Sequence, residues 1–343
     1  MKSLTVVFTG GGSGGHVSPN LALIDYLRQI RPDVKIHYVG SNGIEKNIVT
    51  NNIAVFHEIS AHGFIRDKNE LLKNFAVPFH LLKSVNQCKQ ILKNVNPDVV
   101  FSKGGYVALP VILAAKKLGI RTVIHESDMS LGLANKISFL YADICLSTFP
   151  QKNERFITVG APINQKIYSA NKTQAKSFFK LSSAKKTLLV TGGSLGAEFL
   201  NEFILKNFKR LTQSFNVILI AGKNKKININ NGANFYQTDY TRDMPLFYAA
   251  ADYCLTRGGS NTLCELSALG IPFVCVPLLR SGRGEQNQNA EYFQNNGNGC
   301  VLDEKNLNIE NLLTAIKTIK GKSARSIDGT KRICEYILGY CKT

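Results

Sequence analysis

Short apolar runs rich in β-branched residues alternate with helical patterns through the first half of the chain. The run 4–8 is uninterrupted, as in a strand buried on both faces of a parallel sheet. After it, apolar residues recur at helical spacing from Val17 to Ile30. Further strands are predicted at 53–59, 98–102, 121–125, 144–147 and 156–159, and helices near 45–51, 80–94, 107–118 and 131–140. This alternation predicts an α/β fold with a doubly wound parallel sheet.

The alternation starts again after Gly160-Ala161-Pro162, which we interpret as a linker. Strands are predicted at 186–191, 216–221, 252–255 and 272–277, and helices at 198–211, 263–269, 290–295, 309–319 and 323–340. The second half therefore repeats the architecture of the first. We predict two Rossmann-like domains, an N-terminal one at 1–163 and a C-terminal one at 164–324.

The first predicted strand ends in a glycine-rich loop, Gly10 to Gly15, followed by His16. Glycines let the backbone approach a ligand closely, and the helix behind them offers free N–H groups, so the loop predicts an anion site. Its spacing also fits the dinucleotide fingerprint, which requires an acidic residue after the second strand. Here that strand ends in Gly-Ser-Asn, with no acid before Glu45, which disfavours a nicotinamide-dependent dehydrogenase. The imidazole of His16 at this site suggests general-base chemistry.

Two more loops end a strand and open a helix, at 192–197 and 257–262. Ligands of open α/β sheets bind at the carboxyl ends of the strands, so two facing domains would surround one cleft. A single glycine pair is more often turn geometry than a site. Three such loops favour a ligand that carries phosphate.

Three polar side chains of the second half have both a binding and a structural interpretation. Glu265 lies one helical turn after the third loop, where a carboxylate can accept hydrogen bonds from ribose hydroxyls. It equally suits the first turn of a helix, which favours acids. Gln286 and Asn289 would contact sugar hydroxyls, or would only cap a polar loop.

Two further strand ends in the first half carry chemistry on the same rim as His16. One is the turn 102–106, with Lys103, and the other is His125-Glu126-Ser127-Asp128. The His-Glu-x-x-His zinc pattern is absent, and so is any Asp-x-Asp pair that would hold a divalent cation at a diphosphate. We therefore predict no metal and no cofactor, and assign phosphate binding to backbone amides and helix N-termini.

The composition is that of an ordinary globular protein, with 343 residues, 44% hydrophobic and 19% charged. No apolar run reaches the roughly 18 residues of a membrane span, and the N-terminal run is too short for a signal peptide. The eight cysteines form no C-x-x-C pair, which indicates reduced thiols in a cytosolic protein.

A net charge of +18 suggests an anionic partner, although a lysine-rich proteome would also account for it. We find no nucleic-acid-binding motif, so we predict no nucleic acid as partner. An anionic membrane surface fits better. The stretch 61–80 mixes apolar and cationic residues, and would be either a loop with a helix packed on the sheet or a membrane contact.

Several of these motifs occur together, in the same order, in a known family. The segments 11–17, 102–107, 125–128, 192–197 and 284–290 resemble the MurG family of bacterial glycosyltransferases, and the resemblance runs from residue 4 to about 300. It implies the GT-B fold, two Rossmann-like domains around a cleft. It also implies that a C-terminal helix, about 325–343, joins the first domain.

The resemblance implies an inverting transferase of peptidoglycan synthesis. N-acetylglucosamine would pass from UDP-N-acetylglucosamine to the 4-hydroxyl of a muramyl-pentapeptide linked to undecaprenyl diphosphate (lipid I), which gives lipid II. His16 would be the catalytic base, with Glu126 as its rival. A related GT-B enzyme that uses a UDP-sugar on another acceptor is the alternative.

The resemblance also implies where the substrates bind. The implied donor site consists of Ser13, Gly14, Gly15, Asp128, Asn164, Ser194, Leu195, Gly196, Thr241, Gly259, Ser260, Thr262, Glu265, Gln286 and Asn289. The implied acceptor site consists of Gly12, Gly14, Gly15, Lys103, Gly104, Gly105 and Tyr106. Many members have arginine at the position of Asn164 and asparagine at that of Asp128. Members act peripherally at the cytoplasmic face of the plasma membrane, which would explain the basic charge and the stretch 64–79.

Overall fold

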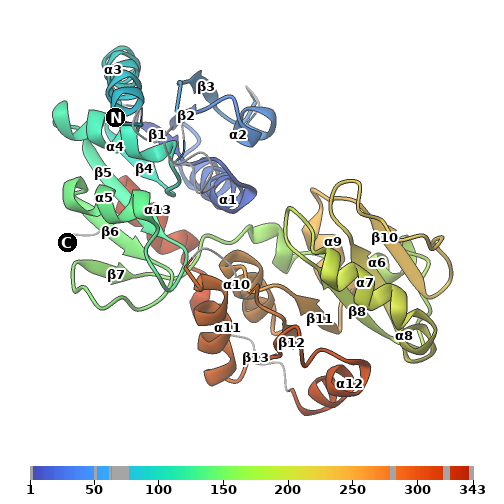
Figure 1. Ribbon diagram of the computed structural model, residues 1–343. Coiled ribbons are helices and arrows are strands. Elements are labelled where there is room, and N and C mark those ends of the chain that lie inside the picture. Colours follow the sequence, from blue (N-terminus) through green and yellow to red (C-terminus); the bar gives the residue numbers. More distant parts are fainter. Residues whose placement is uncertain are drawn as a thin grey trace. The chain divides into compact units, whose positions relative to one another are not determined.

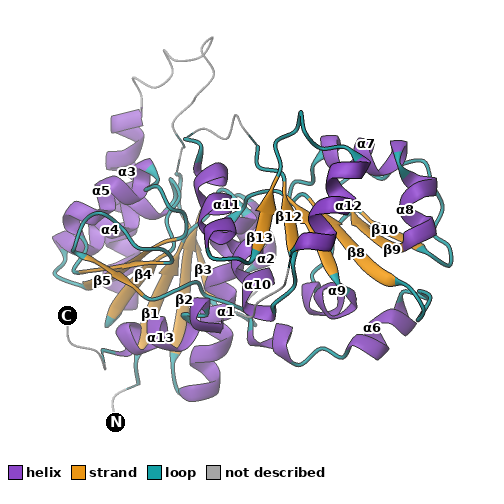
Figure 2. Ribbon diagram, turned by 90° about the horizontal axis from the view of Figure 1, so that it is seen from below, coloured by secondary structure: helices purple, strands orange, loops and turns teal. Residues whose placement is uncertain are grey.

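The computed structural model describes residues 3–49, 52–61, 63, 77–278, 283–319 and 325–339. Most of the stretch 64–79 lies outside the described residues. The chain forms two compact units (Figure 1), one of residues Met1–Asn164 with Asp328–Thr343 and the other of Gln165–Ile327. Each unit contains one parallel sheet with helices on both faces (Figure 2), so the predicted α/β class with two doubly wound sheets is confirmed.

The sheet of the first unit has seven parallel strands in the order β3-β2-β1-β4-β5-β6-β7. Its central strands are apolar on both faces because helices cover both. Along β1, Val6 and Phe8 enter one core, and Val7 enters the other. The strands are β1 (Thr5–Thr9), β2 (Lys35–Gly40), β3 (Val55–Glu58), β4 (Val99–Ser102), β5 (Arg121–Glu126), β6 (Ile144–Ser147) and β7 (Phe156–Thr158).

The helices of the first unit divide between the two faces of the sheet. Apolar residues of α1 and α13 enter one core, and those of α3 and α4 enter the other. The helices are α1 (Gly14–Ile30), α2 (Ile44–Ile48), α3 (Val77–Val95), α4 (Ala108–Lys117), α5 (Leu133–Tyr141) and α13 (Thr330–Leu338).

The second unit repeats the pattern with six parallel strands in the order β10-β9-β8-β11-β12-β13. Its strands are β8 (Lys186–Thr191), β9 (Phe215–Ile220), β10 (Phe235–Thr238), β11 (Tyr253–Thr256), β12 (Phe273–Cys275) and β13 (Gly299–Val301). Its helices are α6 (Lys172–Phe178), α7 (Glu198–Lys206), α8 (Phe208–Ser214), α9 (Met244–Ala250), α10 (Ser260–Leu269), α11 (Glu285–Asn295) and α12 (Ile309–Thr318), and the 3₁₀ turns are η2 (Gln165–Tyr168) and η3 (Arg325–Ile327).

Helix α13 lies in the first unit and packs against α1. The guanidinium of Arg121 donates hydrogen bonds to the carbonyl oxygens of Tyr336 and Ile337. The predicted continuous helix over 323–340 is wrong, because the helix begins only at Thr330. Before it, the N–H of Gly329 bonds to the carbonyl of Ala161, and a side chain at position 329 would collide with the carbonyl of Val159.

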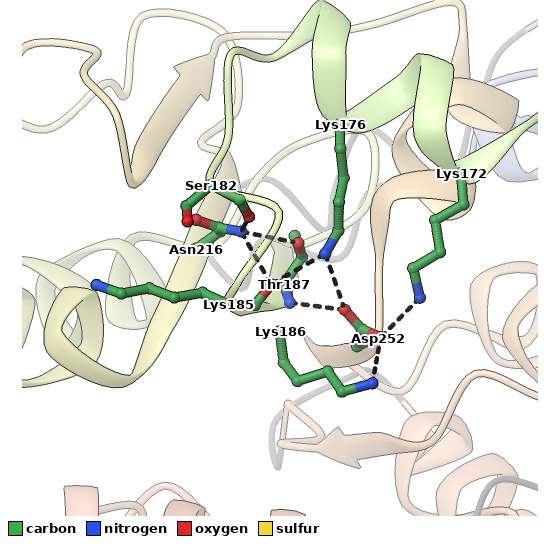
Figure 3. A network of polar contacts seen from close by, with 8 residues as sticks. All are labelled: Lys172, Lys176, Ser182, Lys185, Lys186, Thr187, Asn216 and Asp252. Carbon is green, nitrogen blue, oxygen red and sulfur yellow. Dashed lines mark hydrogen bonds and ion pairs between the residues drawn. The ribbon is translucent and has the colours of Figure 1, made fainter.

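An aspartate stands at the amino end of the sheet in each unit and binds the neighbouring strand. Asp98 accepts a hydrogen bond from the N–H of Thr5 at 2.8 Å, and Asp252 accepts one from the N–H of Thr187 at 2.9 Å. Asp252 also receives Lys172 at 2.6 Å and Lys186 at 3.3 Å (Figure 3). These carboxylates fix the relative register of adjacent strands at the end opposite the glycine loops.

The described cysteines are free thiols, and six of those seven are buried. Among the described helices, none combines the length and the apolar character that crossing a membrane requires.

Candidate active site

Each sheet changes the direction of its strand order between two central strands, β1 and β4 in the first unit and β8 and β11 in the second. Such a switch point opens a crevice at the carboxyl ends of the strands, where ligands of this architecture bind. The glycine loops after β1 and β4, and those after β8 and β11, lie at these two points. These four loops therefore lie at the switch points of their own units, whereas the loop at 125–128 follows β5, the next strand of the sheet.

The first loop passes from β1 into α1 with Gly10 and Gly12 at φ values of +152° and +81°. L-residues with a side chain rarely adopt these conformations, so the loop requires glycine there. Ser13 is the N-cap of α1, but its side chain does not cap the helix. The N-terminus of α1 thus has no side-chain cap, and the helix dipole favours an anion there.

The carboxylate of Glu45 holds the first glycine loop in place through hydrogen bonds. It is fully buried and accepts hydrogen bonds from the N–H of Gly12 at 3.2 Å and from the N–H and hydroxyl of Ser41 at 2.9 and 2.6 Å. A Cβ on Gly11 would lie 2.5 Å from its Oε1. In the sequence, Glu45 appears only as an acidic residue too far after the second predicted strand to bind the ribose of a dinucleotide. Its structural role depends on a tertiary contact.

The loop after β4 packs directly on the first loop. A Cβ on Gly105 would lie 2.5 Å from the carbonyl oxygen of Gly11, and one on Gly12 would lie 2.6 Å from the ring of Tyr106. Gly104 and Gly105 have φ values of +95° and +83°. The two loops that carry the predicted acceptor residues are therefore in direct contact, with Tyr106 exposed on them.

His16 lies in the first turn of α1, partly exposed, with its Nδ1 2.9 Å from the hydroxyl of Ser13. Burial, reinforced by the positive charge of Lys103, lowers the pKa of His16 to about 4. Asp128 and the carbonyl of Gly11 oppose this shift. At neutral pH the imidazole is therefore uncharged, and one ring nitrogen has a lone pair available to accept a proton.

Lys103 points into the unit instead of toward solvent, and it is only 1% exposed. Its ammonium lies 2.7 Å from Nδ1 of His125 and also donates to the hydroxyl of Ser127. Nε2 of His125 lies 2.9 Å from the carbonyl of Gly160. His125 is therefore neutral, with Nδ1 accepting and Nε2–H donating, and burial together with Lys103 holds its pKa well below the usual range.

Glu126 is buried, and its carboxylate receives several donors of its own loop. Oε1 accepts from the N–H groups of Ser127 and Asp128 at 2.8 and 3.1 Å. Oε2 accepts from the N–H of Gly132 at 3.1 Å and from the amide of Asn135 at 2.9 Å. Burial and the charge of Asp128 raise the pKa of Glu126. The four bonds nevertheless occupy both oxygens and make this carboxylate the centre of the loop that carries Asp128.

In the second unit, the loop 192–197 approaches the end of β9 closely. A Cβ on Gly196 would lie 2.2 Å from the carbonyl oxygen of Ala221, and one on Gly192 would lie 2.3 Å from the N–H of Ala197. Ser194 and Leu195 are exposed at the loop's tip. Helix α7 follows without a side-chain cap. The loop thus presents backbone amides and one hydroxyl.

The loop after β11 is held by two side chains of α11. Oε1 of Gln286 accepts from the N–H groups of Gly258 and Leu278 at 3.2 and 3.0 Å. The buried amide of Asn289 donates to the carbonyl of Gly258 at 3.2 Å. These contacts correspond to the structural interpretation of both residues. They also fix Gly259 and Ser260, where α10 begins without a side-chain cap.

Glu265 lies on α10, and its Oε2 accepts a hydrogen bond from the hydroxyl of Tyr248 at 2.6 Å. Burial raises the pKa of Glu265 to about 7, while the bond from Tyr248 lowers it. Tyr248 carries no sequence motif, and its bond to Glu265 is a tertiary contact between residues of α9 and α10. Thr241 bonds through its hydroxyl to the N–H of Asp243, and Asn164 is the last residue of the first unit before η2.

Comparison with known proteins identifies the class. The model of the glycosyltransferase family 28 N-terminal domain matches residues 6–146, and that of the C-terminal domain matches residues 187–332. Crystal structures of Acinetobacter baumannii MurG (22% identity, 98% of this chain and 99% of that chain, TM-score 0.73) and of the kitacinnamycin glycosyltransferase (17%, 99% of each, 0.75) share the fold. The protein is a two-domain glycosyltransferase with the GT-B fold.

The full-length relatives define the family. Proteins of Clostridium perfringens strain SM101 (37% identity, 96% of this chain, 94% of theirs) and Clostridium botulinum strain Alaska E43 (38%, 94% and 96%) are both named UDP-N-acetylglucosamine–N-acetylmuramyl-(pentapeptide) pyrophosphoryl-undecaprenol N-acetylglucosamine transferase. The chain belongs to this family of N-acetylglucosamine transferases, the MurG family.

Proposed function

We propose that this chain transfers N-acetylglucosamine from UDP-N-acetylglucosamine to the muramyl 4-hydroxyl of lipid I, with inversion at the anomeric carbon. The observation that carries the proposal is the similarity, over 96% of the chain, to relatives that bear the name of this transferase. The two switch-point sites support it, because a nucleotide-sugar and a lipid diphosphate both require clustered backbone amides.

His16 is the general base of this proposal. Its ring is neutral at neutral pH and partly exposed beside the amides of Gly14 and Gly15. A neutral imidazole can take the proton of the attacking hydroxyl as the bond to the anomeric carbon forms and UDP leaves. Glu126 is the weaker candidate, since four hydrogen bonds engage its oxygens.

The second unit would hold the donor. Ser194 and the loops 192–197 and 258–260 would contact the diphosphate, where uncapped helix ends stabilise the departing charge without a metal ion. Glu265 would accept the ribose hydroxyls, the backbone near Thr241 would meet uracil, and the segment with Gln286 and Asn289 would meet the sugar. The glycine loops that carry Gly12, Gly104 and Gly105 would meet the acceptor's diphosphate, and the buried Lys103 would contribute its positive charge.

An anionic membrane surface, at the cytoplasmic face, is the proposed place of action. The described start of α3 exposes Phe79 and Leu82, and α5 exposes Leu133 and Leu140, beside lysines such as Lys83 and Lys136. Helices α3 and α5 both pack against α4, so these side chains belong to one side of the unit. Co-sedimentation with liposomes should increase with anionic lipid content and decrease with salt. Binding that ignores both variables would contradict an electrostatic contribution.

The central test is transfer of radiolabelled N-acetylglucosamine from its UDP donor to a short-chain lipid I analogue. The wild type should form product, and His16→Ala should lose roughly 10²–10⁴-fold in kcat at unchanged UDP affinity. Glu126→Gln keeps the size of the side chain and serves as the comparison. Transfer that survives in His16→Ala would move the base elsewhere. Tight UDP-sugar binding without transfer would indicate another acceptor.

A further inference from the structure

We propose that Tyr248 is a positioning residue of the donor site, which holds the Glu265 carboxylate in place for the ribose hydroxyls of the nucleotide. The inference rests on the proposed function, because it assigns Glu265 to the ribose. It adds a second layer to the site, a phenol from helix α9 that acts through a carboxylate on helix α10.

The geometry makes Tyr248 a fixed support. Its side chain is 2% exposed, and its hydroxyl donates a hydrogen bond to Oε2 of Glu265 at 2.6 Å. Burial, reinforced by the charge of Glu265, raises the pKa of Tyr248 well above its usual value, so the phenol stays protonated. The phenol is therefore a fixed donor held directly against the Glu265 carboxylate.

The chemistry of ribose recognition explains why this support matters. Ribose hydroxyls can donate to a carboxylate oxygen, and the ionised carboxylate is the stronger acceptor. Burial disfavours that ionised form of Glu265, and the phenolic donor favours it. The bond to Tyr248 occupies Oε2, whereas Oε1 receives no hydrogen bond from the residues that the structure describes. Glu265 is partly exposed.

Tyr248→Phe removes one hydroxyl and keeps the ring in the core. We expect the Kd of UDP, measured by titration calorimetry, to rise about tenfold, the size of one charge-assisted hydrogen bond. UDP without its 2′- and 3′-hydroxyls should bind wild type and variant equally, since neither ligand hydroxyl is present to be positioned. In the transfer assay, the KM for the donor should rise while kcat changes little. Tyr253→Phe, on β11 in the same unit, is the matched control and should leave both nucleotides unaffected.

The outcomes distinguish the proposed role of Tyr248 from the proposed function of the protein. Equal weakening of both nucleotides in Tyr248→Phe would show a merely structural role and overturn the inference. If the wild type distinguishes UDP from the nucleotide without ribose hydroxyls, an unchanged UDP affinity in Tyr248→Phe would also overturn the inference. A wild type that binds neither nucleotide would overturn the proposed function itself, and the assignment of Tyr248 with it.

Discussion

Single residues in the first unit act mainly by fitting two backbone loops against each other. Gly11, Gly12 and Gly105 are required because a Cβ at any of them would meet a neighbouring loop or side chain. Glu45 and Glu126 use their carboxylates to gather N–H donors from such loops. The residues that bind substrate in the proposal are thus mostly backbone groups, and the conspicuous side chains hold those groups in position.

Gly105→Ala tests this close approach. The new methyl group would overlap the carbonyl of Gly11 at 2.5 Å, and the φ of +83° already disfavours alanine. We expect a loss of about 2–3 kcal/mol in the free energy of unfolding and at least a tenfold fall in kcat/KM for transfer. Gly119→Ala is the matched control, because Gly119 has a φ of +68° but no atom within 4 Å of its Cβ. Equal effects of the two substitutions would rule out the loop contact as the cause.

At the scale of elements, aspartates at the amino ends of the strands join neighbouring strands, and Asp252 is the most heavily bonded of them. Burial raises its pKa, but hydrogen bonds from Lys172 and Thr187 outweigh that and leave the pKa below its usual value. Asp252→Asn removes the charge while the N–H of Thr187 keeps an acceptor. We expect a loss of about 1–3 kcal/mol in the free energy of unfolding, measured by urea denaturation. Asp33→Asn, at an exposed pair with Arg31, should change little. Comparable losses would contradict the role of burial.

The sequence predicted those elements whose signals are local. Runs of apolar residues ending in glycine identified β1, β8 and β11, since parallel strands and phosphate loops have this local pattern. The pattern did not predict α6 or α9. Helix α6 is short and polar, and α9 is short and has a proline in its first turn. The helix predicted at 198–211 is divided at Asn207, whose amide bonds back to the carbonyl of Phe203. The supports of the site, Glu45 and Tyr248, depend on tertiary contacts and had no local signal.

At the scale of the molecule, the chain returns to its first unit after completing the second. Ile333, Cys334, Tyr336 and Ile337 are buried in the same core as the apolar side chains of α1. The core of the first unit is therefore completed by residues of α13. Its core combines segments from both ends of the chain, which is a long-range contact that sequence periodicity alone does not contain.

All six histidines also lie in the first unit, and this predicts opposite responses of the two units to acid. Burial lowers the pKa of His16, His37, His57 and His125, so their neutral forms stabilise the fold fully above pH 6.5. As the pH falls below 6.5, the unfolded chain takes up these protons first and stability is lost. At pH 5.5 a strongly shifted histidine costs about 1.4 kcal/mol, whereas Glu126, whose pKa is raised, contributes in the opposite direction. In the second unit, the pKa of Glu265 at about 7 has the opposite effect, because the folded state binds the proton and gains stability as the pH falls from 7 to 4.5.

Hydrogen exchange at pH 7.5 and 5.5, corrected for intrinsic rates, should show lower protection at the lower pH in β5 and unchanged or higher protection in β8. Parallel loss in both strands would mean that the histidines do not control the acid response. A difference between the two strands that His125→Gln leaves unchanged would mean the same for His125.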